Sequence, residues 1–172
     1  MLGAPRKPKI GKTLAFDMEE YCLSAVALYK QISGHTSLKD ARTPFCPEGS
    51  LPEADECTRG ELSGSACSIL MKDLWLARLS RPDIQRPICE LATKVQCWSR
   101  NDDRRVHRLM CYMNSSSFFR LVGKVNDLPK DLKLLLFVDA DLCGNSLTSR
   151  STSGGYLVLA GPDTWFPLMW VS

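Results

Sequence analysis

Apolar residues recur every three or four positions through the first part of the chain, which is the spacing of one face of an α-helix. This spacing predicts helices over residues 16–32, 60–79 and 82–98, and a fourth from a turn at 99–102 to about Met113. Gly34 is a plausible end for the first helix, and Ser99 is a plausible N-cap for the last. Prolines and Gly49 interrupt residues 35–58, so this stretch is predicted to be a loop.

After Asn114 the pattern changes to short apolar runs bounded by turn residues, which is typical of β-strands. Strands are predicted over residues 118–125, 132–138, 156–160 and 164–171. The run 132–138, LKLLLFV, has almost no polar alternation, so it predicts a central strand buried on both faces. The turn at 161–163 predicts an antiparallel hairpin, and Pro167 suits an edge or a bulge. The predicted fold class is α+β, a helical segment followed by an antiparallel β-meander.

Composition narrows the function only slightly. Lys and Arg outnumber Asp and Glu by 22 to 19, a weak basic bias that permits contact with nucleic acid without requiring it. No apolar run approaches the roughly 18 residues that span a bilayer. Residues 1–12 are basic and rich in Pro and Gly, without the apolar region of a secretory signal. We therefore expect a flexible leader and an intracellular protein, cytoplasmic or nuclear, without membrane contact.

The chain has eight cysteines and two histidines. No cysteines form a CxxC pair, the close spacing that structural zinc sites usually show. Several cysteines lie in apolar patterns, where a reduced thiol behaves as a small hydrophobic group. Buried, reduced cysteines are therefore favoured, and a small cysteine-rich metal protein remains an alternative. The cysteines are Cys22, Cys46, Cys57, Cys67, Cys89, Cys97, Cys111 and Cys143.

Three groups of motifs occur in a specific order along the chain. The first group consists of RGELSGS at 59–65 and RPDI at 81–84, and the second is RLMCYM at 108–113. The third joins FVDADLCGN at 137–145 to RSTSGGY at 150–156. In this order they resemble the polyprotein of copia-type LTR retrotransposons, from the end of the reverse transcriptase into the ribonuclease H domain.

The resemblance implies three regions. Residues 1–58 would be the N-terminal helix and linker from the end of the reverse transcriptase, 59–114 a helical connection, and 115–172 the truncated, ribonuclease H-like strands. The implied function is reverse transcription and Mg²⁺-dependent hydrolysis of RNA in RNA–DNA hybrids. The implied partners are such a hybrid or another nucleic acid, and the rest of the polyprotein.

The same resemblance assigns Asp139 as the first catalytic aspartate and a ligand shared by two Mg²⁺ ions. Asp141 is two positions further along the strand, so its side chain is expected on the same face, and it is a weaker candidate ligand. Without the resemblance, both aspartates would read simply as the end of a strand. The family's catalytic glutamate lies on a helix beyond the third strand, and this chain ends at Ser172, so the resemblance implies an incomplete site that binds Mg²⁺ poorly.

Other features point away from an active enzyme. No YVDD-type reverse-transcriptase motif precedes residue 60, Leu142 replaces the family's aromatic residue, and the STSGG segment has an extra glycine. We therefore expect the isolated chain to be inactive. The alternative is a domesticated, noncatalytic module that binds nucleic acid or protein.

Four arginines are candidate contacts to nucleic-acid phosphates. Arg104, Arg105 and Arg108 lie in the fourth predicted helix, and Arg150 lies in a polar turn near Asp139. Basic groups on one helix face suit the phosphate backbone of a hybrid. An ordinary solvated face beside Asp102 and Asp103 is the favoured explanation of the three helical arginines, and Ser/Thr-rich turns are common.

Overall fold

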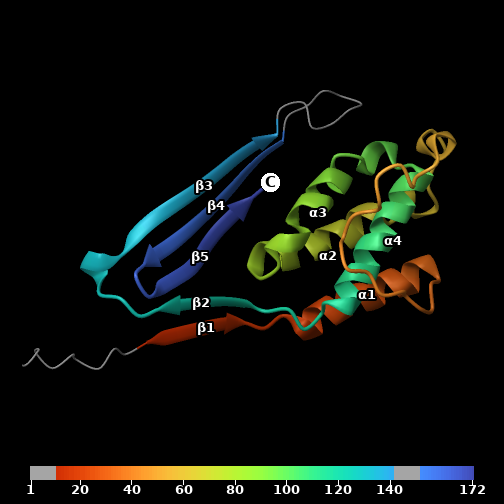
Figure 1. The fold of residues 1–172 in the computed structure, drawn as a ribbon. Coiled ribbons are helices and arrows are strands. Elements are labelled where there is room, and N and C mark those ends of the chain that lie inside the picture. The colour runs from red at the N-terminus through yellow and green to blue at the C-terminus, as the bar shows by residue number, and fades with distance from the viewer. Residues whose placement is uncertain (1–10, 142–151) are drawn as a thin grey trace, which may run out of the picture. The chain divides into compact units, whose positions relative to one another are not determined.

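The computed structural model describes residues 11–141 and 152–172, except for the side chains of Asp141 and Thr152, and its fold is α+β (Figure 1). The chain divides into two compact units. The helical unit comprises residues 16–120. The sheet unit is described over residues 11–15, 121–141 and 152–172. The predicted fold class is confirmed. The regional boundaries at 58 and 114 stay predictions.

The helical unit contains all four predicted helices. They are α1 Glu19–Ser33, α2 Ala66–Leu79, α3 Gln85–Ala92 and α4 Arg100–Ser115. The third is shorter than predicted, because 3₁₀ turns at Pro82–Ile84 and Val95–Cys97 replace both of its ends. Further 3₁₀ turns lie at Glu53–Glu56, Glu61–Gly64 and Pro129–Asp131. None of the helices described is both long enough and apolar enough to cross a membrane.

The helix ends follow the predicted signals. Gly34 has φ 73°, a left-handed conformation that glycine adopts at little cost, and its N–H donates to the Lys30 carbonyl at 2.9 Å. Ser99 begins α4 with a capping box. The Asp102 N–H donates to Ser99 Oγ at 3.2 Å, and the Ser99 N–H donates to Asp102 Oδ2 at 3.0 Å.

One hydrophobic core lies within the helical unit, and all four helices contribute to it. Its fully buried members include Tyr29, Leu70, Ile88 and Leu109. In each helix the core members lie on the apolar face that the sequence pattern predicted. The pattern that predicted the helices therefore also identified much of the core.

The described residues of the sheet unit form a five-stranded antiparallel sheet. The strands are β1 Lys12–Phe16, β2 Leu121–Val125, β3 Lys133–Asp141, β4 Thr152–Gly161 and β5 Thr164–Val171. Their order across the sheet is β1-β2-β5-β4-β3. The strand β1 was not predicted, because the leader was expected to end at residue 12 and the first helix to begin at residue 16, with no element assigned between them.

The prediction that residues 132–138 form a central, buried strand is wrong. The strand β3 lies at the edge of the sheet, and Leu134, Leu136 and Val138 are 65%, 61% and 75% exposed. An apolar run marks a central strand only when partners are available on both sides. Within the described residues β3 pairs with β4 alone.

The hairpin of β4 and β5 is confirmed, with Gly161 paired to Thr164. The ladder is irregular near its middle, where Leu157 pairs with Met169 but Val158 pairs with Pro167. Leu168 is therefore the extra residue of a β-bulge beside the proline. A proline cannot donate a ladder hydrogen bond, so the predicted association of Pro167 with a bulge is confirmed.

Candidate functional site

Asp139, the predicted catalytic aspartate, lies within β3. The antiparallel ladder of β3 and β4 places Asp139 opposite Gly154, and Ala140 opposite Ser153. These residues come from the DAD and STSGG motifs, which therefore meet on adjacent strands. The Asp139 side chain is exposed. A carboxylate on a paired strand has a fixed backbone and remains open to solvent, which suits contact with a ligand.

The described residues do not form a site that fits two Mg²⁺ ions. Asp139 is the one predicted ligand whose side chain is described, because for Asp141 only the backbone, part of β3, is placed. Within the described ranges, no three or more His, Cys, Asp or Glu residues come together in a group that could hold a metal ion. Two Mg²⁺ ions need several carboxylate oxygens, so no catalytic step through a metal follows from these residues.

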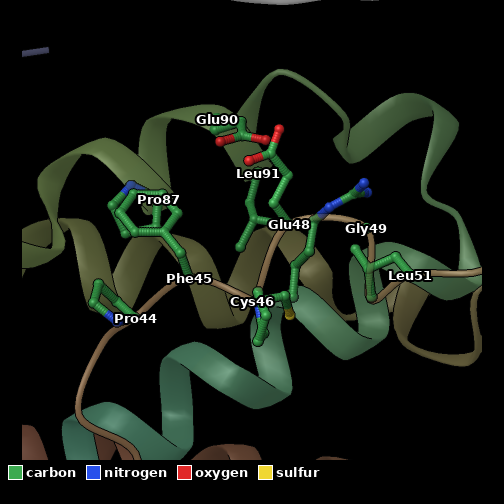
Figure 2. Close-up of a pocket in the computed structure, with 11 residues that line it drawn as sticks. Pro44, Phe45, Cys46, Glu48, Gly49, Leu51, Pro87, Glu90 and Leu91 are labelled. Carbon is green, nitrogen blue, oxygen red and sulfur yellow. The ribbon is translucent and has the colours of Figure 1, made fainter.

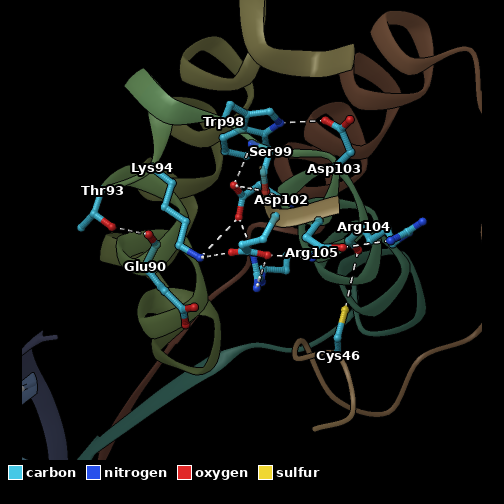
Figure 3. A network of polar contacts seen from close by, with 12 residues as sticks. Cys46, Glu90, Thr93, Lys94, Trp98, Ser99, Asp102, Asp103, Arg104 and Arg105 are labelled. Carbon is cyan, nitrogen blue, oxygen red and sulfur yellow. Dashed lines mark hydrogen bonds and ion pairs between the residues drawn. The ribbon is translucent and has the colours of Figure 1, made fainter. Parts of the chain in front are cut away.

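Arginines of α4 hold the loop that precedes α2. Figure 3 shows Arg105 beside Asp102, and the Cys46 thiol of the loop beside the Arg104 carbonyl. Arg104 forms an ion pair with Asp55 at 2.7 Å. Arg105 contacts Glu56 at 3.1 Å and Asp102 at 2.7 Å. Burial acts to raise the pKa of Glu56, but hydrogen bonds from Asn101 and Arg105 outweigh it and lower that pKa overall.

Arg108 holds an earlier point of the same loop. Its Nε donates to the Thr43 carbonyl at 2.9 Å, and its Nη2 donates to Thr43 Oγ1 at 3.1 Å. The three helical arginines therefore have partners inside the protein, as ordinary structural residues do. Arg150 lies outside the described residues. Contact of these four arginines with nucleic acid stays a prediction.

The loop and α3 enclose a pocket of about 270 Å³ (Figure 2). Its walls are polar and apolar in nearly equal parts: prolines, Phe45 and leucines of both elements supply apolar surface, and Glu48 and Glu90 also line it. The lining residues are Pro44, Phe45, Cys46, Pro47, Glu48, Gly49, Leu51, Pro87, Glu90, Leu91 and Arg105. The pocket was not predicted, because the loop has no periodic pattern.

Two motifs of the resemblance have structural roles. In RPDI, Arg81 is 2% exposed, and its guanidinium donates to Asp83 and to the carbonyl and hydroxyl of Ser116 at 2.7–3.2 Å. Tyr112 donates to the same Asp83 carboxylate at 2.7 Å. This cluster joins the end of α2 to the end of α4.

In RGELSGS, Gly60 needs to be glycine because the chain passes very close to α4. A Cβ at this position would lie 2.5 Å from the Ser99 carbonyl oxygen. The following N–H groups of Glu61 and Leu62 donate to the Asp103 carboxylate at 2.7 and 3.2 Å. Trp98 donates to the same carboxylate at 2.7 Å (Figure 3).

His107 is the centre of a second polar cluster. Its Nδ1 lies 2.9 Å from the Tyr29 hydroxyl, and its Nε2 lies 3.5 Å from the Cys111 thiol. The His35 ring lies 4.4 Å away, centroid to centroid. Burial lowers the pKa of His107 and raises that of Cys111. A neutral thiol is a weak nucleophile, so this pairing of cysteine and histidine does not resemble an activated catalytic dyad.

All seven described cysteines are free thiols, and Cys143 lies outside the described residues. Burial is confirmed for Cys22 and Cys111, and burial raises the pKa of Cys22 to about 11. The prediction of burial is wrong for the exposed thiols Cys57, Cys67 and Cys97. Their exposure follows from their position at the ends of turns and on the outer face of α2.

Asp73 is a buried carboxyl that the sequence reading missed. It lies in α2, is 0% exposed, and neither carboxyl oxygen has a hydrogen-bond partner among the described residues. Burial raises its pKa well above the ordinary value, and Lys72 lowers it only in part. Its spacing from Leu70 and Ala77 already places it on the apolar face of the helix, which was the available signal.

No protein-family model, curated protein or solved structure matches the chain.

Proposed function

We propose that the chain is a segment of a retroelement polyprotein, comprising the end of a reverse transcriptase and the first strands of a ribonuclease H domain. In the complete polyprotein that domain would hydrolyse RNA in RNA–DNA hybrids with Mg²⁺. The observation that carries the proposal is the ladder of β3 and β4. It pairs Asp139 with Gly154, so the two motifs of the resemblance meet on adjacent antiparallel strands.

The proposal has consequences for the isolated chain. One exposed carboxylate holds Mg²⁺ weakly, and a pair of ions needs more ligands. The proposal therefore predicts that the isolated chain does not cleave a hybrid, and that the rest of the polyprotein is the partner that completes the site. Contact of the isolated chain with the phosphates of a hybrid is a separate prediction, which depends on the candidate arginines. Reverse transcription takes place inside the cell, so the proposal places the protein in the cytoplasm or nucleus.

The first test is binding of a fluorescent RNA–DNA hybrid, measured by anisotropy at several salt concentrations. We expect affinity to fall with salt, as it does for contacts to phosphate. Arg150→Glu should weaken binding about tenfold, and Arg78→Glu, which changes an exposed residue of α2, should have little effect beyond net charge. Absence of binding at low salt would contradict the proposed function.

Cleavage of the same hybrid in Mg²⁺ is the second test. We expect no cleavage above the Asp139→Asn control. Cleavage that is lost in Asp139→Asn would show that other carboxylates complete the site. The family assignment would then stand, and the conclusion that the isolated chain lacks a metal site would be wrong.

The second candidate function is a noncatalytic interaction module. It is favoured by the partners of the α4 arginines, because Arg104, Arg105 and Arg108 hold the loop of their own unit. A module of this kind would expose other surfaces to a protein partner. It would show no salt-dependent affinity for the hybrid in the anisotropy experiment.

A further inference from the structure

A cluster of nitrogen and sulfur donors lies where the segment after α1 meets α4. His107 and Cys111 are four positions apart on α4, so their side chains are neighbours on one face of the helix. His107 Nε2 lies 3.5 Å from the Cys111 sulfur. The ring centroid of His35, from the segment after α1, lies 4.4 Å from that of His107. The cluster therefore brings together three side chains of the types that bind zinc.

The distance between His107 and Cys111 suits a bound metal ion. A tetrahedral zinc ion holds nitrogen at roughly 2.0–2.1 Å and sulfur at about 2.3 Å, which places two such ligands about 3.5 Å apart. The distance from Nε2 to Sγ is also 3.5 Å. In the metal-free protein this distance corresponds to a hydrogen bond between the thiol and the ring. A metal ion between the two atoms would therefore replace one proton, with little movement of α4.

Tyr29 orients the His107 ring for this role. Its hydroxyl lies 2.9 Å from Nδ1, the ring nitrogen that does not contact Cys111. When Nδ1 carries the proton and donates to this hydroxyl, Nε2 keeps its lone pair free on the side of the sulfur. Metal-binding histidines usually have their second ring nitrogen fixed by a hydrogen bond of this kind. Tyr29 is 1% exposed, so the surrounding core holds the hydroxyl in place.

His35 is the candidate third ligand, and it has to turn toward the other two. In the described part of the chain, no three such ligands surround a single point as the side chains stand. The required movement is small, because two histidine rings on one tetrahedral zinc ion have centroids about 5 Å apart. The His35 side chain is exposed and follows Gly34, the residue that ends α1, so little packing resists its rotation.

The surrounding charges select the class of ion. Burial raises the pKa of the Cys111 thiol, while a backbone hydrogen bond from Lys39 and the positive charges of Arg108 and Lys39 act to lower it. These positive charges favour the thiolate but repel an ion that is held by electrostatic attraction alone. Thiolate and imidazole ligands bind soft or borderline transition metal ions, whereas Mg²⁺ and Ca²⁺ prefer oxygen ligands.

We propose that His35, His107 and Cys111 together bind one thiophilic transition metal ion, such as Zn²⁺, with water in the fourth position. Two nitrogen–metal bonds and one sulfur–metal bond form, and the thiol proton of Cys111 passes to solvent. The ion holds the segment after α1 against α4. The inference is independent of the proposed function, because it uses no residue of the sheet unit.

Titration with Co²⁺ tests the site, because Co²⁺ takes the place of Zn²⁺ and a cobalt–thiolate bond has its own charge-transfer absorption. We expect the reduced full chain to show this absorption, Zn²⁺ to abolish it by competition, and excess Mg²⁺ to leave it unchanged. Cys111→Ser should lose the absorption. His107→Gln and His35→Gln should each weaken Co²⁺ binding at least about tenfold.

The matched control is Cys67→Ser, which changes an exposed thiol of α2 and should bind Co²⁺ like the unmodified chain. Circular dichroism should confirm that all variants are folded, and His35→Gln alters only an exposed side chain. The inference is overturned if the unmodified chain shows no charge-transfer absorption, if Cys111→Ser keeps it, or if Cys67→Ser removes it. Unchanged Co²⁺ affinity in His35→Gln would overturn the three-ligand site.

Discussion

The two units of this chain form regular elements equally well but bury their side chains very differently. Every member of the described hydrophobic core lies in the helical unit, between Cys22 and Met113. Among the described residues of the sheet unit, the buried apolar side chains are those of Val158, Ala160 and Pro167. A sheet can satisfy its backbone groups by pairing, but it buries a face only when a second layer covers it. Backbone pairing and core formation are therefore separate requirements.

The two units also differ in the burial of their polar groups, which is greater in the helical unit. The helical unit contains the buried guanidinium of Arg81 and the buried carboxyl of Asp73. The sheet unit has an exposed ion pair between Lys124 and Asp163 at 2.9 Å, a type that contributes little to stability. Single substitutions should therefore change the stability of the helical unit strongly, and that of the sheet unit weakly.

Hydrogen exchange should show the largest difference between the units. We expect amides in the middle of α4 to open with a free energy of about 5 kcal/mol or more. Amides on the free edge of β3 should open with a free energy near zero. Mass spectrometry of exchanged peptides measures both units at once. Equal protection of β3 and α4 would contradict the comparison.

Replacement of Arg81 should have the largest effect of any single substitution. Arg81→Met removes a buried guanidinium and its hydrogen bonds to Asp83 and Ser116. The Asp83 carboxylate keeps the hydrogen bond from Tyr112, and the Ser116 carbonyl keeps the one from the Phe119 N–H. We expect the free energy of unfolding of the helical unit to fall by about 3 kcal/mol, at the low end for a buried pair because Asp83 is 34% exposed.

Urea unfolding measures this loss in a background that reports only the helical unit. With Trp165→Phe and Trp170→Phe, the remaining tryptophans are Trp75 and Trp98, both in that unit. The matched control is Arg78→Met on the exposed surface of α2, which should change stability by less than about 0.5 kcal/mol. If the two methionine variants were equally stable, the Arg81 cluster would have no role in stability.

Replacement of Asp73 should have the opposite effect and raise the free energy of unfolding of the helical unit. Its carboxyl is buried without a partner, so Asp73→Leu, which replaces it with an apolar group of similar size, should stabilise the helical unit by about 1–3 kcal/mol at neutral pH. The raised pKa of Asp73 adds a pH dependence. Its contribution is most favourable below its unfolded value, near 3.8, and is lost as the pH rises.

The matched variant is Asp73→Asn, which keeps the size and the buried polar atoms but removes the titration. Both variants should lose the decline in stability that the unmodified chain shows as the pH rises from about 4 to about 7. Only Asp73→Leu should also gain the full stabilisation. Unchanged pH dependence in Asp73→Asn would show that another group causes the decline.

The sequence predicted those features that depend on neighbouring residues. The start of α4 follows from Ser99 and Asp102, and the end of α1 follows from Gly34, because capping uses groups within a few positions. The bulge at Pro167 follows from a missing donor. Asp73 could have been found in the same way, since its spacing along α2 places it on the buried face.

Features that depend on distant residues could not be predicted in this way. LKLLLFV reads the same whether it pairs on one side or on two, so the edge position of β3 depends on which other strands are present. Arg105 resembled a basic surface residue until its partner Glu56, from an aperiodic loop, was placed beside it. RPDI was useful as a family motif, but the burial of Arg81 depends on Ser116, far along the chain.

Replacement of His107 should have the smallest effect on stability of these substitutions. The effect should appear only in how the stability of the helical unit depends on pH. Burial lowers the pKa of His107, with further contributions from His35 and Lys39. Its contribution to stability is therefore present above its unfolded pKa, near 6.5, and is lost as the pH falls. Between about pH 7.5 and about pH 5.5, the melting temperature of the helical unit should fall further in the unmodified chain than in His107→Gln. His35→Gln, which removes only the neighbouring ring, should reduce this fall in part. A fall of equal size in all three proteins would mean that protonation of His107 does not destabilise the helical unit.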